Sequence, residues 1–235
     1  MAIDDLSLNF HETFSPQIVY VAKIIALASK NYCGDKHEIS TITGIPTGQS
    51  SGKVVPHIKY ANYMGLIKYN LQDKKYSLSL TNIGKVVYEQ DPYLMEDVTK
   101  WLCNFWITDK KIGAPQWSFL FRVYNSTFES MENIEFIKNK AAEFFKKDVD
   151  FGVVRSSYQN ECFESLKLIE FDNSGKKLSF NRLSSKYEAK YVYAFSLLRS
   201  WEMYYSNIRE ITVNQLIDEI KWGRPFGFDY DETLD

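Results

Sequence analysis

KVVPHIKYANYMGLIKYNLQDKKYSLSLT, residues 53–81, contains a helix-forming run followed by two strand-forming runs. Apolar residues recur at helical spacing in residues 53–64, and Gly65 is typical of the position just after a helix. The two later runs favour β-strands and are joined by the polar residues Gln72, Asp73 and Lys74. The stretch therefore predicts a helix that leads into a β-hairpin. The side chains expected on the buried face of this hairpin are Leu71, Tyr76, Leu78 and Leu80.

Two further helices are predicted upstream of this stretch. Ile18, Val21 and Ile25 recur at helical spacing within residues 16–31, and residues 37–43 fit a short second helix. Three helices followed by a hairpin is the element order of a winged helix. In that fold the third helix commonly enters the major groove of DNA and the hairpin lies along the backbone.

The chain is predicted to fold as two domains. The first, residues 1–91, is the winged-helix domain, which ends with a helix leading to Asp91 and Pro92. The second, residues 92–235, is rich in aromatic side chains and in apolar residues at three- and four-residue spacing, which predicts helices. A hairpin is expected near residues 167–180. The predicted fold class is thus α+β, mainly α with short β-hairpins.

A weak internal repeat connects the two halves. CFESLKLIEFDNSGKKLSFN, residues 162–181, has the same order of features as residues 62–81: a helix end, Leu-Ile, a strand, a polar turn with two lysines, and a second strand. A second winged-helix-like unit explains this repeat. Chance similarity between two common hairpins also explains it, and both interpretations stay open.

Composition limits the classes of function. The formal net charge of −2, from 28 basic and 30 acidic residues, gives no overall positive field that would draw the chain to nucleic acid or anionic lipid. Residues 36–75, however, hold six lysines against two acidic residues, a local surplus that favours a phosphate-binding face. That range holds no arginine for bidentate contact with guanine.

Other classes find no support in the sequence. Cys33, Cys103 and Cys162 are odd in number and far apart, which argues against a disulfide framework and against a zinc site. The N-terminus MAIDDLSLNF does not resemble a signal peptide, and no run approaches the ~18 apolar residues of a membrane span. No Ser-His-Asp or Cys-His set is visible. We therefore expect a cytoplasmic protein that is not an enzyme, with no cofactor, no metal and no membrane partner.

TGQSSGK, residues 47–53, resembles a phosphate-binding loop, but its glycines are one residue too close and Val54 replaces the required Ser or Thr. It is better interpreted as a helix entrance, where a serine caps the first N–H groups and the positive helix end is open to a DNA phosphate. An ordinary solvated surface is the alternative. The residues expected to contact DNA are Ser50, Ser51, Lys53, His57, Lys59, Tyr60, Lys74 and Lys75.

Two further motifs allow a site or a structural role. In FHETF, residues 10–14, His11 beside Glu12 could shuttle protons or hold a metal; alternatively the two phenylalanines dock the segment while His11 and Glu12 bond to the backbone. In the aromatic tail at residues 222–234, which is expected to pack onto the body, the acidic run could bind a cation or be solvated. The residues of that run are Asp229, Asp231 and Glu232.

Several segments of the sequence together indicate one family: FHETF, SGKVVPHIKYANYMGLI, YSLSLTNIGKVVYEQDPYL and WGRPFGFDYDETL. Over nearly the whole chain, the sequence resembles the bacterial domain-of-unknown-function family numbered four thousand and seven. The genes of that family are often found beside genes for DNA phosphorothioation or related phage defence. The resemblance implies an accessory role in DNA modification or defence, but no catalytic mechanism. Two hypotheses for the function follow. The protein is either a winged-helix protein that binds double-stranded DNA, or an adaptor that holds other proteins of such a complex without contacting DNA.

Overall fold

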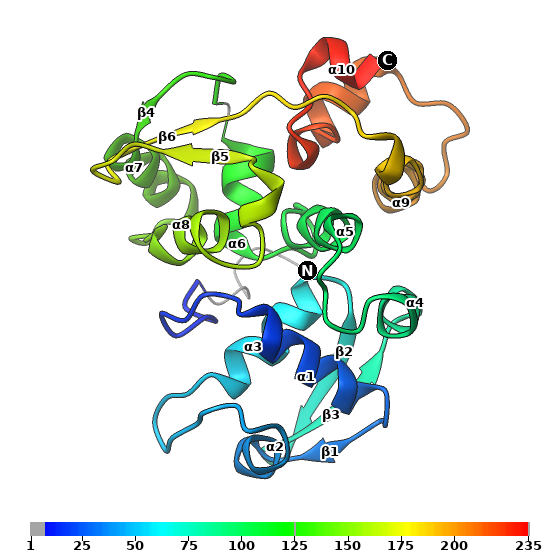
Figure 1. Cartoon of the computed structure of the whole chain (residues 1–235). Helices are drawn as coiled ribbons and strands as arrows, with labels where there is room; N and C mark the ends of the chain where they lie inside the picture. The colour runs from blue at the N-terminus through cyan, green and yellow to red at the C-terminus, as the bar shows by residue number, and fades with distance from the viewer. Residues whose placement is uncertain (1–7, 125, 235) are drawn as a thin grey trace.

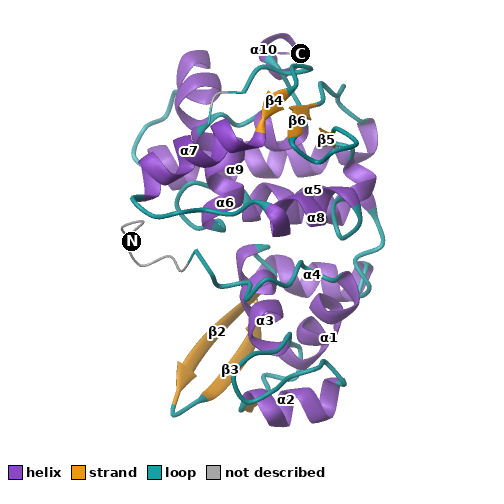
Figure 2. Ribbon diagram, turned by 90° about the vertical axis from the view of Figure 1, so that its left-hand side faces the viewer, coloured by secondary structure: helices purple, strands orange, loops and turns teal. Residues whose placement is uncertain are grey.

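The computed structural model describes residues 8–124 and 126–234 (Figure 1). The fold is α+β and mainly helical, as the sequence predicts, and the described residues form two three-stranded antiparallel sheets. Figure 2 shows one sheet with its helices at one end of the molecule and the remaining helices at the other. The expected domain boundary at residues 91 and 92 falls between α4 and α5, and the division into two domains stays a prediction. Residues 1–7, which include most of the segment judged unlike a signal peptide, lie outside the described residues.

Between residues 8 and 91, the first part of the chain contains four helices and one sheet. Its helices are α1 (Ile18–Ala28), α2 (Lys36–Thr43), α3 (Val54–Tyr63) and α4 (Asn82–Gln90). Its strands are β1 (Cys33–Gly34), β2 (Ile67–Gln72) and β3 (Lys75–Leu80), in the sheet order β1-β3-β2. The predicted order of three helices and a hairpin is present, with the short β1 added between α1 and α2, and the winged-helix assignment stays a prediction.

Local chemistry explains where these helices begin and end. Asp35 and Glu38 form a capping box at the start of α2, where each side chain accepts a backbone N–H of the other residue. Pro56 lies in the first turn of α3, where its missing N–H would have had no helical partner, so it does not interrupt the helix. Gly65 follows α3 with a φ of 74°, a conformation that favours glycine.

The hairpin of β2 and β3 runs from the pair Ile67 and Leu80 to the pair Gln72 and Lys75. The two residues between, Asp73 and Lys74, both have positive φ angles, 50° and 65°, as in the primed two-residue turns that match strand twist. Tyr76 and Leu78 are buried as predicted. The expectation for Leu71 is wrong, since it is 52% exposed. Figure 2 shows the reason: the turn end of the hairpin extends beyond the helices that cover its base.

The second part has more helices and a second small sheet. Its α-helices are α5 (Asp97–Ile107), α6 (Pro115–Ser118), α7 (Ile134–Phe145), α8 (Gly152–Gln159), α9 (Lys190–Tyr205) and α10 (Tyr230–Leu234). Two π-helical segments are η2 (Phe119–Val123) and η5 (Gln215–Ile220), and the 3-10 turns are η3 (Glu164–Leu166), η4 (Tyr187–Ala189) and η6 (Arg224–Phe226). The strands are β4 (Glu132–Asn133), β5 (Ile169–Phe171) and β6 (Lys177–Phe180).

The second sheet repeats the plan of the first. Its order, β4-β6-β5, places a two-residue strand against the second strand of a hairpin, as in β1-β3-β2. In both parts a short strand is followed by two α-helices and then by the hairpin. The hairpin expected near residues 167–180 is present. The repeat thus extends beyond the hairpin seen in the sequence, and the second winged-helix-like unit stays an interpretation of it.

Helix α5 lies at the centre of the core, in contact with α3, α9 and η6. A Cβ added to Gly65 would lie 2.7 Å from the Trp106 ring, so the end of α3 and helix α5 approach closely. The C-terminal tail packs onto the body as predicted, with Tyr230 as the exposed exception. The buried tail residues are Trp222, Phe226 and Phe228. In the described part of the chain, no helix is long and apolar enough to cross a membrane.

Candidate nucleic-acid interface

The loop before α3 is a tight turn rather than a capping segment. Thr47 and Gly52 form an isolated β-bridge, and the Gly48 N–H donates to the Ser51 carbonyl at 2.8 Å. Ser50 and Ser51 lie exposed at the tip of this turn. The expectation that one of them caps α3 is wrong, because the cap position is Lys53 and no side chain bonds there.

The protein's own carboxylate lies at this loop. Glu12 accepts a hydrogen bond from the Gly52 N–H, at 3.2 Å across 40 residues of sequence. Glu12 and Thr13 both have positive φ angles, 48° and 71°, so the chain bends sharply here. The amide that a DNA phosphate would have used in this glycine-rich loop therefore already has an anionic partner.

The FHETF segment is docked against the body, which fits the structural interpretation of the motif. Phe10 is buried, and its ring lies 5.0 Å from the ring of Tyr60. His11 Nδ1 accepts the Thr13 N–H at 3.1 Å, and His11 Nε2 lies 3.2 Å from the amide nitrogen of Gln116. Burial lowers the pKa of His11. Among residues 8–124 and 126–234, no group of three or more His, Cys, Asp or Glu side chains could hold a metal ion.

His57 and Tyr60 are fully buried and connect α3 to residues 14–17, the segment that precedes α1. His57 Nδ1 donates to the Lys53 carbonyl at 2.6 Å, and its Nε2 accepts the Gln17 N–H at 3.0 Å. Burial lowers the pKa of His57 to about 4, so the ring is neutral at pH 7. The Tyr60 hydroxyl donates to the Phe14 carbonyl at 2.8 Å. Neither side chain reaches the surface, so we do not retain either as a DNA contact.

The side chain of Lys53 also contacts residues of the protein itself. Its ammonium donates to Gln17 Oε1 at 3.2 Å and lies 5.4 Å from the centre of the Tyr20 ring. Lys59 is only partly exposed. Helix α3 contacts α1, α2, α5 and β2, and it does not present the open face of a recognition helix. Its buried residues are Val54, Pro56, His57, Ile58, Tyr60 and Ala61.

The hairpin, residues 67–80, here called the wing, keeps its lysines at the surface. The pairing register places every second residue on the face away from the helices. The exposed residues of this outer face are Lys68, Asn70, Gln72, Lys75 and Ser77. Lys74 is exposed in the turn beside Asp73. Sequence reasoning singled out Lys74 and Lys75 but missed Lys68, Asn70 and Gln72, although strand alternation carries the signal.

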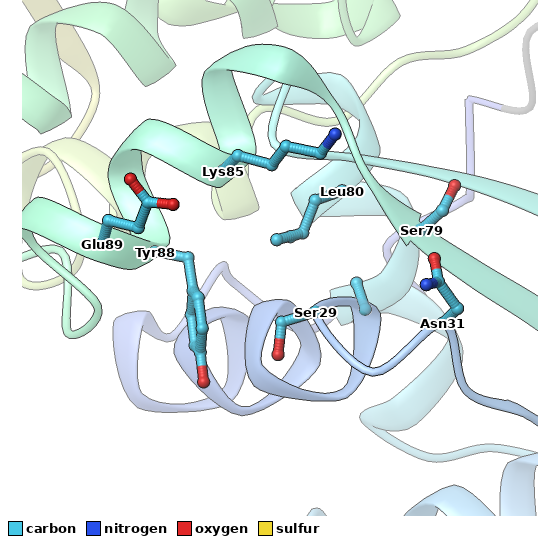
Figure 3. A pocket seen from close by; sticks show the side chains of 8 residues that line it. Ser29, Asn31, Ser79, Leu80, Lys85, Tyr88 and Glu89 are labelled. Atoms are coloured by element: carbon cyan, nitrogen blue, oxygen red, sulfur yellow. The ribbon is translucent and has the colours of Figure 1, made fainter.

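A hollow of about 500 Å³ lies between the end of α1, the end of β3 and α4 (Figure 3). Its lining includes Lys85, Tyr88 and Glu89 of α4. Their polar ends point in different directions rather than toward one another. The lining residues, all within the described chain, include neither histidine nor cysteine. The polar side chains of α4 are therefore not directed at a common point in this hollow, and the wing is the stronger candidate interface.

The family described as "Protein of unknown function (DUF4007)" matches residues 9–235 of this chain. A magnesium ion-bound SspB crystal structure is similar, with a TM-score of 0.73 and 17% identity, over 98% of this chain and 78% of that one. A second SspB crystal structure has a TM-score of 0.70 and 17% identity, over 96% of this chain and 75% of that one. At this identity the likeness concerns the fold alone. No curated protein matches the chain.

Proposed function

The chain belongs to the DUF4007 family, and from that premise we propose that it is a non-catalytic accessory protein of a bacterial DNA-modification or phage-defence system that binds duplex DNA through its wing. The gene neighbourhoods implied by the family resemblance support a phosphorothioation-type system. The main observation in favour of DNA binding is the wing. Its residues Lys68, Lys74 and Lys75 are exposed on a hairpin that extends from the body.

The chemistry of the wing suits the phosphate backbone. Each lysine near a duplex neutralises a phosphate and releases counterions, so affinity depends strongly on salt. Amide groups also bond to phosphate oxygens, and Asn70 and Gln72 supply them on the same face as Lys68 and Lys75. Phosphate contacts carry no sequence information, so the wing should bind all duplexes alike.

The body beneath the wing provides a fixed support. The N-terminal segment is joined to α3 by Tyr60, and α1 is joined to α3 by His57 and Lys53. At the same place Glu12 occupies the loop amide of Gly52. Under this proposal, the residues around α3 hold the wing in position, and the lysines of the hairpin make the contact.

The second candidate function is that of an adaptor that does not contact DNA. Helix α9 and the turn that precedes it, η4, favour this function. Tyr187, Tyr191 and Leu198 are 76%, 75% and 65% exposed, and their spacing of four and seven residues places them along one side. Exposed apolar side chains in a row are typical of a surface that receives a partner helix. Under this alternative the stripe binds another protein of the complex, and the wing is only a surface hairpin.

A gel-shift assay with a plain duplex at low salt tests the proposal. We expect the wild type to bind and the double variant Lys74→Ala, Lys75→Ala to bind more weakly. Lys146→Ala with Lys147→Ala is the matched control, because both residues are exposed and Lys146, like Lys74, has a positive φ. Equal affinity of the wing variant and the wild type, or no shift with wild-type protein, would favour the adaptor.

A further inference from the structure

A pocket of about 470 Å³ lies in the second part of the chain, far along the sequence from the wing. It is formed by the segment α6–η2, the end of α7 and the region of η5. Its volume falls within the range of sites for small ligands. The lining residues are Lys110, Pro115, Ser118, Phe119, Arg122, Val123, Phe144, Phe145, Asp218 and Lys221. We call it the cationic pocket.

Two π-helical segments meet at the cationic pocket. Phe119 and Arg122 come from η2, while Asp218 comes from η5 and Lys221 follows it directly. Lys221 has a φ of 56° as it ends η5. Segments of π-helix are rare in proteins and often occur at functional sites. Their meeting at one pocket therefore indicates that the pocket binds a ligand.

Arg122 is a buried cation with unused donors. Its side chain is 1% exposed, and Nη1 donates to the carbonyls of Ile220 at 3.1 Å and Lys221 at 2.9 Å. Its Nε and Nη2 have no hydrogen-bond partner among the described residues. These two groups form one edge of the guanidinium, and that edge can bind a carboxylate or phosphate through two parallel hydrogen bonds.

Two lysines of the lining add positive charge near Arg122. Lys110 donates to the Glu219 carbonyl at 2.5 Å, and Lys221 donates to the Val123 carbonyl at 3.1 Å. Burial lowers the pKa of Lys110, and repulsion from Arg122 lowers it further. Burial also lowers the pKa of Lys221 to about 8, with repulsion from Lys110 adding to it. Asp109 attracts both Lys110 and Arg122, and Glu219 attracts Lys110. Among the residues that line the pocket, however, three are cations and Asp218 is the acid.

The lining also holds three phenylalanines, Phe119, Phe144 and Phe145. The ring centroid of Phe144 lies 5.5 Å from that of Phe119 and 4.9 Å from that of Phe145. Phe144 is 40% exposed, so a ligand can reach it. A second hollow of about 640 Å³ shares Phe119, Val123 and Phe144 with the cationic pocket and adds Phe136. Together the two hollows offer room for a flat body beside the cations.

We propose that the cationic pocket binds a phosphate group carried on a planar aromatic body, the chemistry of a mononucleotide, either free or at the 5′ end of a DNA strand. Lys110, Arg122 and Lys221 receive the phosphate, and the ring of Phe144 stacks on the base. This site lies outside the proposed function, because the wing takes no part in it. Its failure would therefore leave the DNA proposal standing.

Isothermal titration with adenosine 5′-monophosphate, and with adenosine as the matched ligand, tests the proposal. We expect the nucleotide to bind and adenosine to bind at least about tenfold more weakly. Lys110→Gln and Lys221→Gln should each weaken nucleotide binding by about tenfold or more. Lys85→Gln, an exposed lysine outside the pocket, should leave it unchanged. No binding of the nucleotide up to millimolar concentration, or equal binding by folded pocket variants, would overturn the proposal.

Phe144→Ala provides a second variant in case the lysine variants do not fold, because Phe144 is partly exposed. It should weaken binding of the nucleotide; an unchanged affinity would refute the stacking. Single strands with a 5′-phosphate or a 5′-hydroxyl distinguish the source of the ligand. Stronger binding of the phosphorylated strand to protein carrying Lys74→Ala and Lys75→Ala would assign the pocket to DNA ends, and binding of the free nucleotide alone would assign it to a metabolite.

Discussion

Acidification should destabilise the fold through His57, which is buried as a neutral ring between the Lys53 carbonyl and the Gln17 N–H. The pKa of the folded state is about 4, against the usual 6.5 of an unfolded histidine. Between these values the unfolded chain binds more protons, so stability is complete above about pH 6.5 and falls as pH decreases toward 4. A shift of this size corresponds to about 3 kcal/mol in total, of which about 2.5 kcal/mol is lost by about pH 4.5.

Urea unfolding of the wild type and of His57→Gln at several pH values measures this effect. The other titrating groups, including His11, are shared by both proteins and cancel in the difference. Near pH 7.5 the variant should be less stable by about 1–3 kcal/mol, because two backbone groups lose a buried partner. Near pH 4.5 this difference should have decreased by about 2.5 kcal/mol. A difference that does not change with pH would refute the assignment of His57 as a neutral buried ring.

Three further predictions concern stability. His11→Ala should lower the melting temperature by about 2–6 °C, through loss of the bonds to Thr13 and Gln116, with little change in DNA affinity; a loss of binding at unchanged melting temperature would instead mark His11 as a site residue. Lys53→Glu should destabilise the fold by about 1–3 kcal/mol in urea, since the ammonium packs on aromatic rings, and a neutral effect would show that this packing is unimportant. Gly65→Ala should cost about 1–3 kcal/mol and alter tryptophan fluorescence, because its φ is 74° and the new Cβ would meet Trp106; unchanged fluorescence would contradict that close approach.

The elements themselves were largely predictable because their signals are local. The helix and hairpin of residues 53–81 follow from spacing, from Gly65 and from the polar turn. Leu71 was assigned wrongly because alternation identifies the face of a strand but not how far the body extends beneath it. The second sheet was half predicted: its hairpin repeats a visible pattern, whereas the two-residue strand β4 has no pattern of its own.

The site was less predictable, because its determinants are contacts between distant segments. Nothing near the glycine-rich loop indicates that Glu12, 40 residues earlier, bonds to Gly52. The same holds for Tyr60, whose hydroxyl bonds to the carbonyl of Phe14. These contacts bury α3, which the element order alone would have left as an open recognition helix. The cationic pocket is likewise lined by Lys110, Arg122 and Lys221 from separate segments, so no local sequence motif predicts it.

The salt dependence of duplex binding tests the central claim most directly. Fluorescence anisotropy with one labelled duplex, between about 50 and 200 mM salt, gives the slope of log affinity against log salt. Each lysine that contacts a phosphate contributes about one unit to this slope. We predict that Lys74→Ala with Lys75→Ala flattens the slope by about two units, that adding Lys68→Ala flattens it by about one more, and that Lys146→Ala with Lys147→Ala leaves it unchanged. A wing variant that keeps the wild-type slope, or a wild type that does not bind at the lowest salt, would contradict the account.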